Sequence, residues 1–399
     1  MNALLRAFVR LGLNRFQARI LGVKNGFHGL VRTCHRLQAL ETDADKLQEE
    51  IEAVVGQRGI RRRSQDIVRL DHHSVSGVID RGGIILGSSR CEAFKSPDTQ
   101  QEVMKLLCQQ LCVDAVVVAG GGGTMQGAAV LAQDRSLRVI GIPATIDNDY
   151  DLTERSLGFD TAVHTIVECV ARVNDTASSH HRIMVLETMG RRSGQLAQTA
   201  ALASGAEIVV TPDAGTLTAE RMCEIAQQIE RCLKCGRTHA IVLVTEGVAT
   251  EPPHVAGPSQ ALAGHLQRHF DHIEMDGEVC HVEVRHSVLG HLQRGGSPST
   301  CDRLLAADFA EAAWSVLLAR RPQSGVLGLT HGRIKRHDFD APPLPRRAED
   351  ALRLQRLQQD IADHGRQRLR EEPAEAAFPQ AADRRRAGRR RQRSPRHSR

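Results

Sequence analysis

Short runs of β-branched and apolar residues recur through the middle of the chain, separated by stretches of helical character. Five of them stand out: Val113–Ala119, Arg138–Ile142, Arg182–Leu186, Ala206–Val210 and His239–Val244. Runs with so few polar residues predict strands buried on both faces, and their alternation with helices predicts parallel pairing. We therefore expect an α/β fold with two layered units, whose parallel sheets are covered by helices, over about residues 1–340.

The size and composition agree with this fold class. The chain has 399 residues, of which 41% are hydrophobic and 25% charged. That length suits two domains or one large one, and the composition excludes a wholly disordered or collagen-like protein. No apolar run approaches the roughly 20 residues that span a membrane.

Positive charge is concentrated at the carboxyl end. The net charge is +6, yet residues 384–399 contain nine arginines and no acids, so the remainder of the chain is net acidic. Because this stretch has no aromatic residues that could stack on bases, it supports only non-specific attraction to nucleic acid. A specific nucleic-acid partner is not expected.

Cysteine usage points to a reducing compartment. Ten cysteines in a chain of this length are too sparse for a disulfide scaffold, and Cys232 and Cys235 form the only CxxC pair. This pair follows an apolar helical face that consists of Met222, Ile225, Ile229 and Leu233, and Gly236 can end the helix. Reduced packing cysteines and a cytoplasmic location are favoured over a metal or redox site.

Three peripheral segments allow separate interpretations. Residues 1–23 contain four arginines and no acids, which fits either a transit peptide or an ordinary first helix that leads into a strand at 18–23; we favour the helix. Residues 38–66 read as an inserted amphipathic helix and loop. Residues 341–399 read as a linker, a marginal helix and a disordered arginine-rich tail.

A glycine-rich turn follows the first of the five predicted strands. Gly120–Gly127 contains four consecutive glycines and then opens a helical segment. Such a turn lets the backbone approach a ligand, and amides at a helix start favour an anion. A tight strand-to-helix turn without a ligand is an equally good interpretation of this segment alone.

Two carboxylates follow the next strand. Asp147 and Asp149 lie two residues apart with Thr145 beside them. The carboxyl ends of strands line the ligand crevice of open α/β sheets, so these groups suit proton abstraction and metal positioning. The alternative is a capping cluster for the following helix, which would use one aspartate but hardly both.

Four arginines lie near strand ends and glycine turns: Arg182, Arg191, Arg285 and Arg294. Any one of them could be an ordinary solvated side chain in so arginine-rich a chain. Together in an α/β crevice they would form a site for phosphate groups.

These segments, taken together, resemble the signatures of the 6-phosphofructokinase family. The three most specific matches are Ile142–Asp149 (IPATIDND), Glu187–Arg191 (ETMGR) and Leu289–Pro298 (LGHLQRGGSP). The resemblance also takes in residues 25–29, 81–90 and 179–184, and it runs from Met1 to about Arg333 apart from the insertion. It implies two Rossmann-like three-layer domains with the active site in the cleft between them.

The resemblance also assigns roles. Asp147 would take the proton from the 1-hydroxyl of fructose 6-phosphate, and Arg90, Asp149 and Arg191 would complete the catalytic set. The sugar phosphate would be bound by Thr145, Ile146, Asp147, Arg182, Met189, Gly190, Arg191, Glu246, Arg285, His291, Leu292, Gln293 and Arg294. The donor would be bound by Arg90, Cys91, Gly120, Gly121, Gly122, Gly123 and Thr124. Arg182 and Arg285 would reach into a neighbouring subunit's site, which implies a homo-oligomer, usually a tetramer.

The donor and the domain boundaries follow from the same resemblance. Pyrophosphate-using relatives typically carry an aspartate where this chain has Gly123 and a lysine where it has Ala144, so ATP with Mg²⁺ is favoured. The donor domain would comprise residues 1–158, completed by 293–340, and the sugar-phosphate domain residues 159–292.

The chain departs from the family pattern in two places. Gly122 replaces the acid that normally engages Mg²⁺, so that Asp149 is the remaining candidate metal ligand. The family also opens with a strand and a Gly-Gly-Asp loop before Met-Asn-Ala, whereas this sequence starts at Met1, which we read as a misassigned start codon. The expected activity is ATP-dependent formation of fructose 1,6-bisphosphate; the alternatives are a catalytically impaired homologue that binds sugar phosphate or regulates a partner, and a pyrophosphate-dependent phosphotransferase.

Overall fold

The computed structural model describes residues 1–40, 45–46, 48–49, 51–52, 66–253, 257–275 and 278–344. Most of the predicted insertion at 38–66 therefore lies outside the described residues. The predicted linker, marginal helix and arginine-rich tail also lie outside them from residue 345 onward.

Two four-stranded sheets organise the described chain. The first has the order β12-β11-β4-β3, in which β12 alone is antiparallel, and the second has the all-parallel order β10-β5-β7-β6. The first sheet consists of β3 (Ala115–Gly120), β4 (Arg138–Pro143), β11 (Gly325–Thr330) and β12 (Arg333–His337). The second consists of β5 (Ile183–Thr188), β6 (Ile208–Val210), β7 (Ala240–Thr245) and β10 (Val284–Val288). All five strands predicted from apolar runs are present, and their ends agree within two residues.

Two smaller sheets are antiparallel pairs. β1 (Ile20–Val23) pairs with β2 (Ile67–Leu70), and β8 (Ile273–Met275) pairs with β9 (Glu278–Cys280). The strand expected at 18–23 therefore exists but does not join a parallel sheet. A run this short does not predict which strand it pairs with. Its partner is β2, which follows the 38–66 segment.

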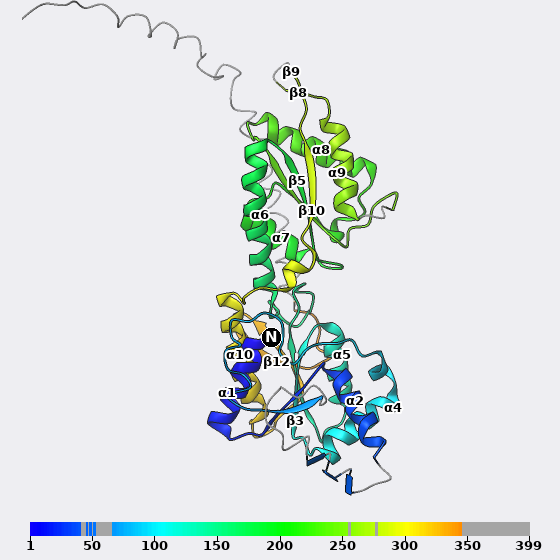
Figure 1. The fold of residues 1–399 in the computed structure, drawn as a ribbon, viewed down its shortest axis with the longest axis vertical. Coiled ribbons are helices and arrows are strands. Elements are labelled where there is room, and N and C mark those ends of the chain that lie inside the picture. Colours follow the sequence, from blue (N-terminus) through cyan, green and yellow to red (C-terminus); the bar gives the residue numbers. More distant parts are fainter. Residues whose placement is uncertain are drawn as a thin grey trace, which may run out of the picture. The chain divides into compact units, whose positions relative to one another are not determined.

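Helices cover both faces of the first sheet (Figure 1). α1 (Asn2–Phe16) and α10 (Thr300–Leu317) pack on the face with Ile140 and Ile142, whereas α2 (Phe27–Gln38), α4 (Pro97–Lys105) and α5 (Gly122–Leu131) pack on the face with Val139. Successive side chains of a strand point to opposite faces, which accounts for this division. Short helical turns η1 (Glu92–Lys95) and η2 (Leu106–Gln110) flank α4. These elements and the first sheet form what we call the first lobe.

The amino-terminal helix belongs to this core. Ala3 and Leu4 are buried, and the ring of Phe8 stacks on Trp314 of α10 with a centroid distance of 4.7 Å. The interpretation of residues 1–16 as an ordinary first helix is therefore confirmed.

The second sheet is covered in the same way. α6 (Phe159–His180) and α7 (Gln195–Ser204) pack on the face with Met184 and Leu186, and α8 (Ala219–Lys234) and α9 (Pro258–Phe270) pack on the face with Ile183 and Val185 (Figure 1). The short helices η3 (Pro212–Ala214) and η4 (Gly290–Arg294) complete this second lobe.

α8 agrees with its sequence prediction. Its four predicted apolar positions are buried, and Gly236 has a φ of 90° just beyond its end. Across the part of the chain that the structure describes, no helix is both long and apolar enough to cross a membrane.

The chain passes between the lobes twice. It enters the second lobe between β4 and α6, and it returns between η4 and α10. The first crossing is the loop that carries Asp147 and Asp149, and the second directly follows Arg294.

Candidate active site

The loop after β4 carries the two predicted carboxylates and is shaped by the residue between them. Asn148 is only 4% exposed and has a φ of 49°, in the left-handed region that asparagine tolerates better than most residues. Its Oδ1 accepts a hydrogen bond from the amide of Ser156 at 2.7 Å, and its Nδ2 donates to Oε1 of Gln195 at 2.8 Å. Asn148 thus anchors the loop to itself and to α7.

Sequence reasoning missed Asn148 as a functional residue. The available signal was an asparagine between two aspartates, since asparagine is enriched at left-handed turn positions. Its neighbour Asp147 donates its amide to Oγ1 of Thr145 at 3.2 Å, which closes the turn from the other side.

Asp147 lies at a meeting point of several chain segments. Burial raises the pKa of its carboxyl, and the negative charge of Asp149 raises the pKa further. Glu246 also raises the pKa of Asp147, while Arg294 and Arg191 lower it. These five residues come from the β4 loop and from the carboxyl ends of β5, β7 and η4, so the tertiary structure brings them together.

The glycine-rich turn lies next to this loop. A Cβ at Gly120 would lie 2.4 Å from Oγ1 of Thr124, so the turn requires glycine there. The amide of Ala144 donates to the carbonyl of Gly120 at 2.9 Å, and a Cβ at Gly121 would have Cβ of Thr145 as a neighbour at 3.8 Å. The turn and the aspartate loop are therefore adjacent.

The amino end of α5 is open. Its N-cap residue is Gly121, and no side chain among the described residues caps it. Gly122 and Gly123 are exposed, and a Cβ at either would meet no described atom within 4 Å. The amides of Gly122 and Gly123 in the first turn of this helix suit an anion.

A family model described as phosphofructokinase matches residues 1–317 of the chain. The chain belongs to the phosphofructokinase family.

Relatives and solved structures agree with this assignment. Proteins named ATP-dependent 6-phosphofructokinase from Clostridium botulinum strains Hall and Alaska E43 are each 33% identical over 340 residues, which cover 85% of this chain and 88% of the relative. A phosphofructokinase structure from Saccharomyces cerevisiae aligns with a TM-score of 0.67 at 24% identity and covers 92% of this chain. This chain spans only 46% of that yeast chain.

A pyrophosphate-dependent phosphofructokinase from Nitrosospira multiformis has the same fold. It aligns with a TM-score of 0.65 at 17% identity and covers 85% of this chain and 79% of its own. The predicted fold class, with α/β lobes of the phosphofructokinase type, is thus confirmed.

The turn after β5, which matches a phosphofructokinase signature, is held from inside. Met189 and Gly190 are buried, and the side chain of Gln293 accepts from the amide of Met189 at 3.1 Å and donates to the carbonyl of Gly290 at 3.0 Å. Gln293 is 1% exposed, so its amide orients the turn and is not offered to a ligand. Its neighbours His291, Leu292 and Arg294 are exposed.

Arg182 and Arg285 lie away from the loops that carry Asp147, Arg191 and Arg294. Arg182 directly precedes β5, and Arg285 pairs with Met184 at the start of the same strand. Met189 and Arg191 follow the opposite end of β5, roughly 20 Å away at about 3.3 Å per residue. Within one chain the four arginines therefore do not share one crevice, because residues before and after a strand lie at opposite ends of it.

Arg182 and Arg285 nevertheless form a group. Both pair with the carboxylate of Glu283, which lies next to them on β10's amino side.

The remaining predicted donor residues precede η1. Arg90 is exposed, and Cys91 is half-buried against the core formed by α2, α4 and α5. The ten cysteines all lie in described segments and none of them forms a disulfide there, including Cys232 and Cys235 near the end of α8. Within the described segments, no group of three or more His, Cys, Asp or Glu side chains is arranged to hold a metal ion.

Proposed function

We propose that this chain transfers a phosphoryl group from ATP to the 1-hydroxyl of fructose 6-phosphate, giving fructose 1,6-bisphosphate in cytoplasmic glycolysis. The observation that carries the proposal is the environment of Asp147, a half-buried carboxyl with a raised pKa among Asp149, Glu246, Arg191 and Arg294. Relatives that match along 88% of their length bear the name of this activity.

Asp147 acts as the general base. It takes the proton of the 1-hydroxyl, whose oxygen then attacks the terminal phosphorus while the bond to the bridging oxygen breaks and ADP leaves. A pKa above the ordinary aspartate value makes the carboxylate a stronger base at neutral pH. Arg90 and Arg191 stabilise the charge on the transferring group.

The donor phosphates bind at the start of α5. The open amides there and the adjacent Thr124 suit a polyanion, with Cys91 and the run Gly120–Gly123 around them. The open space beside Gly123 and the small side chain of Ala144 leave room for a nucleotide, which supports ATP over pyrophosphate.

The residues present fit a Mg²⁺ ion that is shared with the donor. Mg²⁺ prefers oxygen ligands and is commonly held by one or two carboxylates together with substrate phosphates. Asp149 is exposed beside Asp147, and a Cβ at Gly122 would meet no described atom within 4 Å. Bound Mg²⁺ would neutralise charge on the phosphates, and Asp149 is the residue that would hold it.

The sugar phosphate binds in the second lobe. Met189, Gly190 and Arg191 follow β5, Glu246 follows β7, and His291 and Arg294 belong to η4. In this proposal the sugar binds against the residues that follow β5 and β7, and its 6-phosphate lies near His291 and Arg294. Thr145 and Ile146 border the site from the aspartate loop.

Arg182 and Arg285 serve a neighbouring subunit's site in a homo-oligomer, most simply a tetramer. They lie at the amino ends of β5 and β10, whereas the proposed site of their own chain lies at the carboxyl ends of the strands. Mixing inactive Asp147→Ala and inactive Arg285→Ala subunits should restore activity, because some sites then combine an intact Asp147 with an intact neighbouring Arg285. No recovery after mixing would contradict shared sites.

A second candidate function rests on Gly122. Loss of the acid that the family carries there favours a homologue that binds sugar phosphate without turnover, in a regulatory role. Removal of a carboxylate near a metal commonly costs about 10- to 100-fold in affinity or activity.

One assay separates the candidates. The full chain is incubated with fructose 6-phosphate and Mg²⁺, with ATP and pyrophosphate in separate reactions, and fructose 1,6-bisphosphate is measured. Turnover with ATP that Asp147→Asn abolishes and Asp308→Asn, an exposed change on α10, leaves intact supports the kinase. Turnover only with pyrophosphate, or none in a protein that still binds fructose 6-phosphate, contradicts it.

A further inference from the structure

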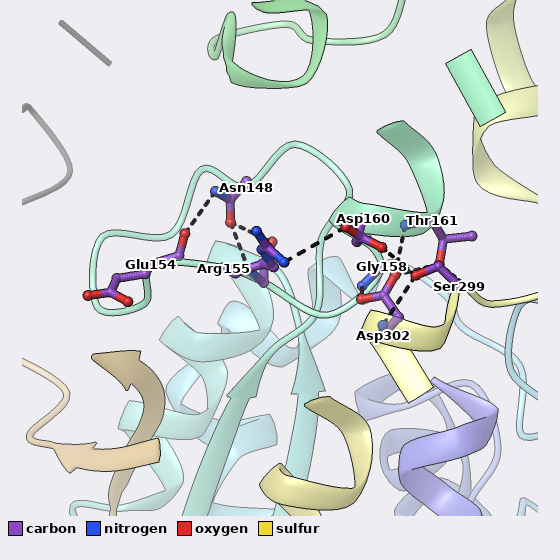
Figure 2. A network of polar contacts seen from close by, with 9 residues as sticks. Asn148, Glu154, Arg155, Gly158, Asp160, Thr161, Ser299 and Asp302 are labelled. Carbon is purple, nitrogen blue, oxygen red and sulfur yellow. Dashed lines mark hydrogen bonds and ion pairs between the residues drawn. The ribbon is translucent and has the colours of Figure 1, made fainter. Parts of the chain in front are cut away.

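The helix that enters the second lobe has no cap of its own. The N-cap residue of α6 is Gly158, whose φ is 102° and which has no side chain to offer its 22-residue helix. Asp302, from the first turn of α10, supplies the missing cap (Figure 2). Its Oδ1 accepts from the amide of Gly158 at 2.8 Å, and its Oδ2 accepts from the amide of Thr161 at 2.9 Å.

The two helices cap each other. Ser299 is the N-cap residue of α10, and its amide donates to Oγ1 of Thr161 at 3.1 Å. Oγ of Ser299 donates to Oδ2 of Asp160 at 2.5 Å and accepts from the amide of Asp302 at 3.2 Å. The hydroxyl of Thr161 in turn donates to Asp302. We call these four residues, Asp160, Thr161, Ser299 and Asp302, the crossed cap.

Burial strengthens the hydrogen bonds of the crossed cap, because water does not compete for them. Asp302 is 3% exposed, and hydrogen bonds to an ionised carboxylate are stronger than those between neutral groups. The positive ends of two helix dipoles meet at this point, and the carboxylates of Asp302 and Asp160 offset them. A neutral side chain at 302 would leave backbone donors buried without an equal acceptor.

The crossed cap joins the two loops that carry the candidate site. The loop with Asp147 and Asp149 ends at Gly158, and the loop with Arg294 ends at Ser299. A further link runs back toward Asp147, because Arg155 pairs with Asp160 at 3.8 Å and Asn148 binds the amide of Ser156 (Figure 2).

We propose that Asp302 is a positioning residue which, through the crossed cap, holds the Asp147 loop against the Arg294 loop. It touches neither substrate in the proposed reaction and acts only through the ends of α6 and α10. The proposal rests on the proposed function for its kinetic consequence. Small displacements of reacting groups can cost about 100-fold in rate.

The test compares Asp302→Asn and Thr161→Val with two matched controls. Asp308→Asn makes the same change at an exposed position of α10, and Thr161→Ser keeps the hydroxyl of the crossed cap. We expect kcat to fall about 10- to 100-fold in both test variants, while the dissociation constants for fructose 6-phosphate and ATP stay within about threefold of the unmodified chain. Both controls should keep their kcat. If Asp302→Asn does not fold, Thr161→Val decides the matter.

Amide hydrogen exchange on the full chain provides a readout that does not need turnover. Asp302→Asn should accelerate exchange in residues 144–157 and in 289–298, with β7 unchanged. Faster exchange confined to 158–161, or an unchanged kcat in folded test variants, would overturn the proposal. If the unmodified chain itself shows no turnover, the proposed function fails, and the exchange result alone judges the positioning role.

Discussion

Thr188 and Thr245 are register partners at the carboxyl ends of the adjacent parallel strands β5 and β7, and both hydroxyls are buried without a hydrogen-bonding partner among the described residues. The two residues are 1% and 0% exposed. They directly precede Met189 and Glu246, two of the residues proposed to bind the sugar. A buried hydroxyl without a partner destabilises the folded state.

Replacement of Thr245 by valine should therefore stabilise the protein. Valine has nearly the same shape and removes the buried hydroxyl, so we expect the free energy of unfolding to rise by about 1 kcal/mol. Thr33→Val is the matched control, since Thr33 is equally buried but its hydroxyl donates to the carbonyl of Gly29 at 2.9 Å. Urea denaturation of both variants measures the difference. A loss of stability in Thr245→Val as large as in the control would show that the hydroxyl has a partner.

Neutralising Asp147 should lower the activity and raise the stability of the folded protein. Because general-base catalysis contributes about 10²- to 10⁴-fold, Asp147→Asn is expected to lower kcat by that order. The same change should raise the melting temperature at pH 7, since the raised pKa means that the folded state disfavours the ionised carboxyl.

The pH dependence of this stability gain has a definite sign. Below the ordinary aspartate pKa of about 4, the carboxyl is protonated in both states and the variant should gain nothing. The penalty of the unmodified chain develops as the pH rises through that value and is complete above the raised pKa. Melting curves from pH 3 to 8, without Mg²⁺ or nucleotide, test this, with Asp308→Asn as the control. A stability gain that grows toward low pH would contradict a raised pKa.

Gly122→Asp should strengthen metal-dependent activity. A Cβ at this position meets no described atom within 4 Å, so aspartate fits, and an acid in the first turn of α5 is favoured by the helix dipole. We expect the Mg²⁺ concentration for half-maximal rate to fall about 10- to 100-fold, because a carboxylate is restored beside the proposed metal. Titration of the rate with Mg²⁺ measures this effect.

Gly123→Asp is the contrasting change. Its neighbouring position is equally open, but an aspartate there occupies space proposed for the nucleotide, so the rate with ATP should fall. Equal effects of both substitutions on the rate with ATP would mean that the two glycines do not have the separate roles assigned to them.

Asn148 should prove as important as the aspartates that flank it. Asn148→Ala loses the side-chain hydrogen bonds and places alanine at a φ of 49°, so we expect a loss of about 2–4 kcal/mol in the free energy of unfolding. Asn148→Gly keeps the backbone freedom and should lose about 1 kcal/mol less. Both should reduce kcat by about 100-fold through displacement of Asp147. A kcat near that of the unmodified chain in Asn148→Gly would exclude the side chain from positioning the loop.

Local sequence pattern was sufficient for the elements and for part of the site. The five apolar runs predicted β3 to β7 in order, and the apolar face of α8 was placed correctly, because burial on one or both faces imposes a period that can be read from residue types. The position of Asp147 at the carboxyl end of β4 followed from strand direction alone. Its raised pKa did not, since Glu246 and Arg294 lie about 100 residues or more away in the chain.

What the sequence determined by itself was the α/β architecture, the family, and the loops that hold glycine, carboxylate and arginine groups. Only the tertiary structure separated Arg182 and Arg285 from the site of their own chain, turned Gln293 inward, and let Asp302 cap a helix whose N-cap residue lies 144 residues earlier. The physical reason is the range of the interactions. Strand and helix periods depend on neighbours a few residues apart. Helix caps that come from another segment and pKa shifts depend on which distant segments are packed together, and so does the end of the sheet at which a side chain lies.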